Sequence, residues 1–196
     1  MNRKISSFIM FFLVAKLGYA QSSKIDSLIS ILKSAKEDTN KVDLLNNLAE
    51  EYRFQKPDSA IIYGSKALVL AKKINWDIGI GYAEYCIGTI FFDRSNFPMS
   101  IDHCFKALAT WESIQKTQNN SKSYVLLLKS RTLGRIGTIY DSKGDYSKAL
   151  EYDFKALKIT EELGNKLGIA KHLGNIGNIY DEQGDTPKAL DYISKH

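Results

Sequence analysis

A nine-residue segment occurs twice in this chain, 40 residues apart, and this internal repeat restricts the possible folds more than any other feature. Leu133–Asp141 has the sequence LGRIGTIYD, and Leu173–Asp181 has the sequence LGNIGNIYD. The similarity continues beyond the segment, since Gly144–Leu150 matches Gly184–Leu190. A unit that recurs at a fixed period indicates a stack of similar structural units, each of which contacts its neighbours.

Two fainter copies precede these. Ile87–Phe91 matches Ile136–Tyr140 at an offset of 49, and the extra residues fall in the polar stretch Lys116–Ser123. The first copy retains the apolar and small residues Leu45, Leu48, Ala49 and Tyr52. We therefore expect a repeat array over residues 41–196, with copies at about 41–76, 77–116, 124–164 and 165–196.

Each copy contains two helical patterns separated by a turn. In the third copy, Leu133, Ile136, Gly137 and Tyr140 are spaced i, i+3, i+4 and i+7, which places them on one face of a helix. Gly144-Asp145 ends that pattern, and a second apolar stripe runs from Tyr146 to Leu163. A helix-interior glycine costs about 1 kcal/mol relative to alanine, so its recurrence predicts a close approach between helix backbones.

The order leucine, small residue, tyrosine and then two alanines resembles the tetratricopeptide repeat, in its long variant of the kinesin light chain type. This resemblance implies an all-α fold, a right-handed α-solenoid of tandem antiparallel helix pairs, that binds proteins or peptides. Three positions depart from the family pattern, namely Glu84, Ser100 and Asp153.

The first 20 residues have the layout of a secretory signal peptide, with basic residues, a short apolar run from Phe8 to Ala15, and a small-residue site ending at Ala20. An uncleaved membrane anchor is the alternative. Residues 21–40 are expected to form a capping helix on the first copy. Removing residues 1–20 reduces 27 basic residues to 24 against 22 acidic ones, and a net charge of +2 does not favour nucleic-acid binding.

No catalytic, cofactor-binding or metal-binding motif is present in the sequence, so we predict that the chain is not an enzyme and has no cofactor. His103, His172 and His196 stand far apart in sequence and are expected to be surface residues. Helical geometry directs Cys86 away from the packed face of its helix, whereas Cys104 lies on a small-residue face. A disulfide between the two cysteines is therefore not expected.

The exposed face of the first helix of each copy is the candidate binding surface. In tetratricopeptide relatives, peptides commonly lie along this concave surface, and asparagines there grip the peptide backbone. The basic cluster of Arg131, Arg135 and Lys171 favours a partner with an acidic segment or a terminal carboxylate. The predicted partner-binding residues are Asn47, Glu50, Tyr82, Thr89, Arg131, Arg135, Thr138, Lys171, Asn175 and Asn178.

Three larger contexts are compatible with this sequence. Tandem repeats behind a signal peptide resemble the periplasmic or extracellular sensory regions of bacterial membrane kinases and nucleotide cyclases, in which the catalytic domain follows the repeats. A free-standing adaptor for envelope assembly is the alternative, and the non-catalytic front end of an enzyme is the third. Because Lys195-His196 align with the middle of a second helix, we expect a truncated last copy that self-associates through residues 165–196.

Overall fold

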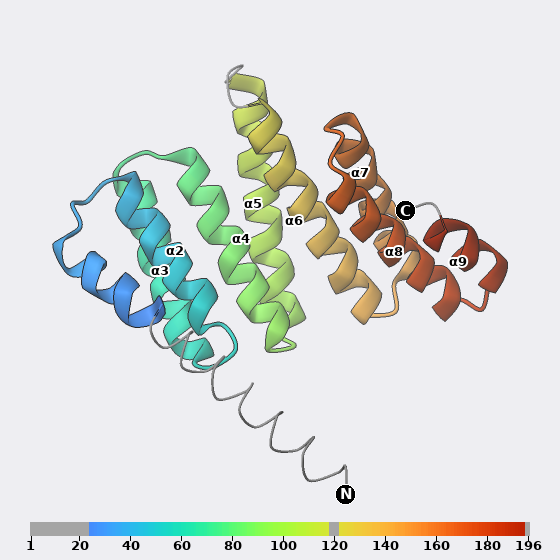
Figure 1. Ribbon diagram of the computed structural model, residues 1–196, viewed down its shortest axis with the longest axis horizontal. Coiled ribbons are helices and arrows are strands. Elements are labelled where there is room, and N and C mark those ends of the chain that lie inside the picture. The colour runs from blue at the N-terminus through green and yellow to red at the C-terminus, as the bar shows by residue number, and fades with distance from the viewer. Residues whose placement is uncertain (1–23, 118–121, 195–196) are drawn as a thin grey trace, which may run out of the picture.

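A computed structural model describes residues 24–117 and 122–194, and within these ranges the chain is helical with no strand (Figure 1). A helix over residues 24–34 comes first. Four antiparallel pairs follow it, and each consists of a first helix and a second helix. They are α2 Thr39–Tyr52 with α3 Pro57–Lys73, α4 Asp77–Asp93 with α5 Phe97–Thr117, α6 Lys122–Ser142 with α7 Tyr146–Glu162, and α8 Lys166–Glu182 with α9 Thr186–Ile193.

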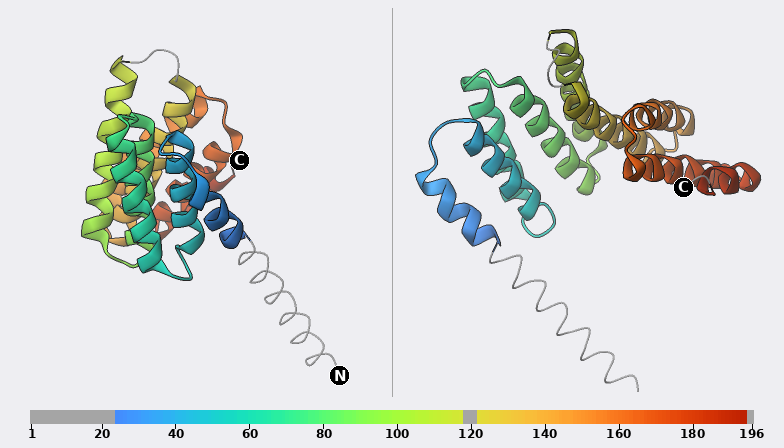
Figure 2. Two further views of the ribbon diagram at one scale, coloured as in Figure 1. Left: turned by 90° about the vertical axis from the view of Figure 1, so that its left-hand side faces the viewer. Right: turned by 45° about the horizontal axis from the view of Figure 1, so that its top comes forward.

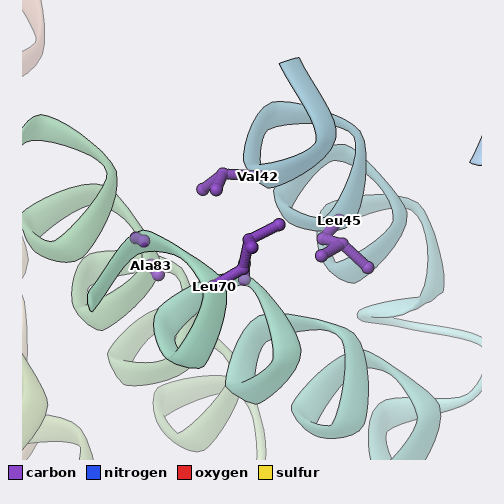
Figure 3. Close-up of a cluster of buried hydrophobic side chains, with 6 residues drawn as sticks. Val42, Leu45, Leu70 and Ala83 are labelled. Atoms are coloured by element: carbon purple, nitrogen blue, oxygen red, sulfur yellow. The ribbon is translucent and has the colours of Figure 1, made fainter. Parts of the chain in front are cut away.

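The pairs stack in chain order from one end of the molecule to the other (Figures 1 and 2). Each helix contacts its neighbours in sequence, and the first helices α2, α4, α6 and α8 also contact one another in series. The hydrophobic core is therefore distributed along the stack. Figure 3 shows one such cluster, in which Val42 and Leu45 of α2 meet Leu70 of α3 and Ala83 of α4.

The helix over residues 24–34 lies against the first pair. Its Ile25 is buried, and Leu32 packs against the cluster of Figure 3. Lys24 Nζ forms an ion pair with Glu51 of α2 at 2.5 Å. The apolar edge of the first pair is consequently covered by this helix, as an end of a repeat stack requires.

Glycine in the first helix allows the two helices of a pair to approach closely. A Cβ atom on Gly88 would lie 2.9 Å from Cys104 Sγ and 3.1 Å from the backbone oxygen of Ser100. A Cβ on Gly137 or Gly177, at the equivalent positions, would meet the second helix of its own pair in the same way. The sequence-based expectation that these recurring glycines mark a close backbone approach is thus confirmed.

A stacked ring pair joins the two helices of every repeat at one level. The ring centroids are 5.5–5.7 Å apart and the planes are inclined by at most 13°. Offset ring stacking adds about 0.5–1.5 kcal/mol beyond the area that it buries. The four pairs are Tyr52–Tyr63, Phe91–His103, Tyr140–Tyr152 and Tyr180–Tyr192.

The turns between helices follow from their glycines and capping residues. Gly144 and Gly184 adopt φ of 74° and 79°, a left-handed conformation that favours glycine. The next residue in each turn, Asp145 or Asp185, accepts a hydrogen bond from a backbone N–H three residues later, which caps the following helix. The sequence therefore fixes where the first helix ends and the second begins.

The predicted fold class, an all-α right-handed solenoid of tandem antiparallel helix pairs, is confirmed. No helix in the described ranges is long and apolar enough to cross a membrane. The predicted signal peptide at residues 1–20 lies outside the described residues, as does His196.

Two glycine substitutions test the close approach of paired helices. Gly88→Ala is expected to lower the free energy of unfolding by about 1–3 kcal/mol, because the added methyl group meets backbone atoms of α5. Gly174→Ala is the matched control, since nothing lies within 4 Å of its Cβ position, and the gain in helix propensity should stabilise the protein by about 0.5–1 kcal/mol. Urea denaturation followed by circular dichroism measures both. Equal effects of the two substitutions would contradict this packing.

Candidate functional site

A cavity of about 250 Å³ opens on the face that the four first helices share. Its walls come from α2, α4, α6 and α8, together with Thr160 near the end of α7 and Asn165 in the following turn. Polar and charged side chains make up much of the lining, among them Glu50, Arg53, Tyr82, Arg131, Lys171 and His172. Such a volume suits one or two residues of an extended peptide, or a small organic group.

One side of this central cavity is basic. Arg131 and Lys171 line it on neighbouring first helices, and neither forms an ion pair with a carboxylate in the described part of the chain. Arg135 is not part of the lining, and its guanidinium lies 4.8 Å from the ring centroid of Phe92. Burial and the nearby charges of Arg135 and Arg131 lower the pKa of Lys171, although Asp153 partly opposes this effect. The uncompensated positive charge favours an anionic ligand group.

The opposite side carries a carboxylate and hydroxyl groups. Tyr82 donates a hydrogen bond from its hydroxyl to Glu50 Oε1 at 2.7 Å, and Cys86 Sγ lies 3.7 Å from the same oxygen. Burial raises the pKa of Tyr82, with smaller effects from Cys86 and Glu50. Arg53 forms an ion pair with Asp93 at 2.8 Å. The charge of Arg53 is therefore compensated within the protein, unlike the charges of Arg131 and Lys171.

Two pairs of a histidine and a buried carboxylate were missed by the sequence reasoning, and one of them includes His172 of the cavity lining. His172 is 2% exposed, and its Nδ1 lies 3.1 Å from Oδ1 of the fully buried Asp153. His103 likewise contacts the buried Glu84, with Nδ1 and Oε2 separated by 2.6 Å. The expectation that these histidines are surface residues is wrong for His172, which is buried, and His103 is only partly exposed. The sequence did contain an indication of these contacts, because Asp153 and Glu84 each stand where the repeat pattern normally has an apolar residue.

Five of the ten predicted binding residues line the central cavity, and the other five have different surroundings. Thr138 donates to the carbonyl oxygen of Gly134 in its own helix, and Asn175 donates to Asp153 Oδ1 at 3.0 Å. Asn178 is exposed on α8, Asn47 lines a second pocket, and Arg135 packs on the ring of Phe92. The five that line the central cavity are Glu50, Tyr82, Thr89, Arg131 and Lys171.

The first helices pack more closely than helical geometry alone suggested. Cys86 and Thr89 were expected on an open face, yet both are 3% exposed in the wall of the cavity. The reason is that α4 contacts both α2 and α6 along this face, which buries its middle. Both cysteines are free, in agreement with the expectation that no disulfide joins them.

Metal binding finds no support in the described ranges, where no three His, Cys, Asp or Glu residues are grouped as ligands. Several cavity residues were not predicted, including Arg53, Tyr85 and Leu167. Leu167 is 83% exposed, an unusual position for a large apolar side chain, and it forms an apolar rim next to Lys171. Its place in the first turn of α8 could have been identified from the sequence, but its proximity to α4 and α6 could not.

Two family models of tetratricopeptide repeats match parts of this sequence. A tetratricopeptide repeat model matches residues 128–195, and the model of the SusR N-terminal TPR domain matches residues 18–104. Among curated proteins, none has detectable sequence similarity to the chain.

Three solved structures illustrate the similarity of fold. A Rap protein complexed with Competence and Sporulation Factor is 19% identical over 92% of this chain and 49% of its own, with a TM-score of 0.75. A signal transduction ATPase with numerous domains and a tetratricopeptide repeat sensor, from Pyrococcus horikoshii, is 21% identical over 90% of this chain and 27% of its own, with a TM-score of 0.71. A kinesin light chain-like repeat protein from Podosopora anserina is 10% identical over 99% of this chain and 94% of its own, with a TM-score of 0.62.

These identities are low, so the likeness extends to the fold alone. The chain spans about half the length of the Rap protein and about a quarter of the length of the ATPase.

Both cysteines are expected to be unreactive in the folded protein. Burial raises the pKa of Cys104 to about 12 and also raises the pKa of Cys86, so neither thiol is ionised near pH 8. Ellman's reagent at pH 8 should therefore react with no thiol in buffer and with two in urea. Rapid reaction of one thiol in buffer would show that the cavity wall around Cys86 is open.

Proposed function

Since the chain is a tetratricopeptide-repeat protein, we propose that it binds a peptide or a peptide-like segment of another protein along the shared face of α2, α4, α6 and α8. The observation that carries the proposal is the central cavity, where Arg131 and Lys171 present charges without a carboxylate partner in the described part of the chain. Repeat scaffolds of this kind are in general non-catalytic.

The partner that we propose carries an acidic side chain or a terminal carboxylate at this position. A carboxylate can accept hydrogen bonds from a guanidinium and an ammonium group at once, and such charged hydrogen bonds are stronger than those between neutral groups. The exposed Leu167 beside Lys171 supplies apolar contact for the adjoining part of the ligand. The likeness to a Rap protein complexed with Competence and Sporulation Factor supports a bound factor on this fold.

The wider role that we propose is sensory. The chain would be the extracytoplasmic sensory or interaction part of a larger bacterial signalling protein. Binding along the shared face of the first helices would control an output domain of that protein. The match to an N-terminal TPR domain and the likeness to an ATPase with a tetratricopeptide repeat sensor support this role. An envelope adaptor that acts alone is the alternative.

The genomic reading frame beyond the codon for His196 separates these two roles. A continuing frame that encodes a membrane-spanning helix and a kinase, cyclase or other output domain is expected for a sensor. A frame that encodes one more capping helix and then stops would contradict the sensory role and favour the adaptor. Fractionation of the producing cells, with an antibody against the repeat region, tests the extracytoplasmic location independently.

Charge reversal in the central cavity tests the proposed binding site. Arg131→Glu and Lys171→Glu are each expected to weaken the binding of acidic peptides by about tenfold, because each removes a charged hydrogen bond and adds repulsion. A pooled library of fluorescein-labelled nonapeptides rich in Asp and Glu, measured by fluorescence anisotropy, is a suitable probe. Lys158→Glu on the exposed side of α7 changes the net charge equally and is the matched control. Equal losses in all three variants would indicate nonspecific electrostatic attraction instead.

The pH dependence of that binding follows from Lys171. Only the protonated amine attracts an anion, and the pKa of Lys171 in the free protein is lowered by burial and by Arg135 and Arg131. Raising the pH therefore neutralises Lys171 before ordinary lysines, and the affinity should fall at a pH below 10.5. Tyr82 and Cys86 have raised pKa values and stay neutral in this range. Lys171→Arg should keep the affinity constant up to pH 10, and a fall in that variant would assign the titration to another group.

A further inference from the structure

A second pocket, of about 380 Å³, lies at the edge of the same face and has the opposite electrostatic character. Its lining comes from α2, from the beginning of α4 and from the beginning of α6. Tyr82 belongs to both pockets, so the two adjoin through this one side chain. The residues that line the second pocket are Asp43, Asn47, Trp76, Ile78, Tyr82 and Tyr124.

Three aromatic rings of this pocket are held in different ways. Trp76 lies directly over Gly79, where any Cβ atom would clash with the indole ring. Tyr82 is oriented by the hydrogen bond from its hydroxyl to Glu50 Oε1. Tyr124 is 53% exposed on α6, which leaves its ring accessible to solvent beside the pocket. The pocket thus combines two positioned rings with one accessible ring.

The only charged group in the lining is the carboxylate of Asp43. It has no ion pair and no hydrogen bond with any residue in the described ranges. Burial raises the pKa of Asp43, and no neighbouring cation opposes this effect. Glu50, on the other side of Tyr82, adds a second negative charge nearby.

We propose that this pocket binds an ammonium group of a ligand, with the rings of Trp76, Tyr82 and Tyr124 around it and Asp43 as its counterion. Aromatic faces attract a cation through the ring quadrupole, and tryptophan does so most strongly. An anion would be repelled by Asp43, and an uncharged apolar group would desolvate the carboxylate further without compensation. A cation is the one class of group that satisfies both the rings and the carboxylate.

The site has a consequence for peptide recognition, and only this consequence rests on the proposed function. A ligand with an ammonium group at Asp43 and a carboxylate at Arg131 and Lys171 would lie across the first helices in one direction only. The ammonium group can belong to a lysine side chain of a peptide or to a free quaternary amine. Both sources share the chemistry that the pocket recognises, and titration with each distinguishes them.

Tryptophan fluorescence provides a direct readout. The protein has two tryptophans, and Trp111 is fully buried, so a ligand-dependent change reports on Trp76. Titrations would use choline, Nα-acetyl-lysine amide and 3,3-dimethyl-1-butanol, which is the uncharged analogue of choline. We expect a saturable change with at least one ammonium compound, and at least about tenfold weaker binding of the uncharged analogue. Tighter binding of choline indicates a free quaternary amine as the source, whereas tighter binding of the lysine derivative indicates a peptide lysine.

Two substitutions assign the change to this pocket. Asp43→Asn removes the charge and keeps the shape, and Tyr124→Leu removes the accessible ring. Each is expected to weaken ammonium binding by about fivefold to tenfold. Both residues are exposed, so folding should be preserved, and a thermal melt followed by circular dichroism verifies it. Asp181→Asn, at an exposed position near the end of α8, is the matched control and should bind like the unmodified protein.

Three results would overturn the proposal: equal binding of the uncharged analogue, no saturable change with either ammonium compound, or unchanged binding in both pocket variants. Failure of this proposal can be distinguished from failure of the proposed peptide-binding function. Arg131→Glu and Lys171→Glu lie outside this pocket and should leave choline binding intact. Loss of acidic-peptide binding with choline binding retained therefore concerns the central cavity alone.

Discussion

The close approach of paired helix backbones is the constraint on which the other features of this structure depend. Gly88, Gly137 and Gly177 face the second helix of their pairs at a distance that leaves no room for a methyl group. Two helices that approach this closely bury part of their apolar surface against each other. The rest of their apolar surface has to be buried by the next pair. The stacked ring pairs and the capped turns recur with the same period, because every pair meets the same requirement.

Stacking at this separation also produces the candidate binding surface. The first helices follow one another closely enough to bury the middle of α4, including Cys86 and Thr89. Charged residues on neighbouring helices consequently surround the same small volume. The central cavity and the second pocket adjoin at Tyr82, yet they present opposite charges to a ligand. A polar ligand that spans both would bind in a defined orientation.

Much of this architecture could be predicted from the sequence, because the repeat fixes the period, the glycines and the turn residues. The same reasoning placed Arg131 and Lys171 on one face, and both line the central cavity. It did not predict the burial of Cys86, since a helical wheel describes one helix and says nothing of the distance to the next pair. The contact between Asp153 and His172 was missed for a related reason, because it joins α7 to α8 of different repeats. The second pocket likewise combines residues from α2, from the beginning of α4 with the preceding Trp76, and from α6, and no sequence periodicity relates them.

Site-specific photo-crosslinking in the producing cells tests the central claim, that partners bind along the face of the first helices. A photoreactive amino acid would replace Asn178 on the exposed side of α8 in one variant and Lys158 on the exposed side of α7 in another. The account predicts a discrete crosslinked product from position 178 that disappears when Arg131→Glu is added, and no such product from position 158. A discrete product from position 158 alone would place the partner on the second helices and contradict the account.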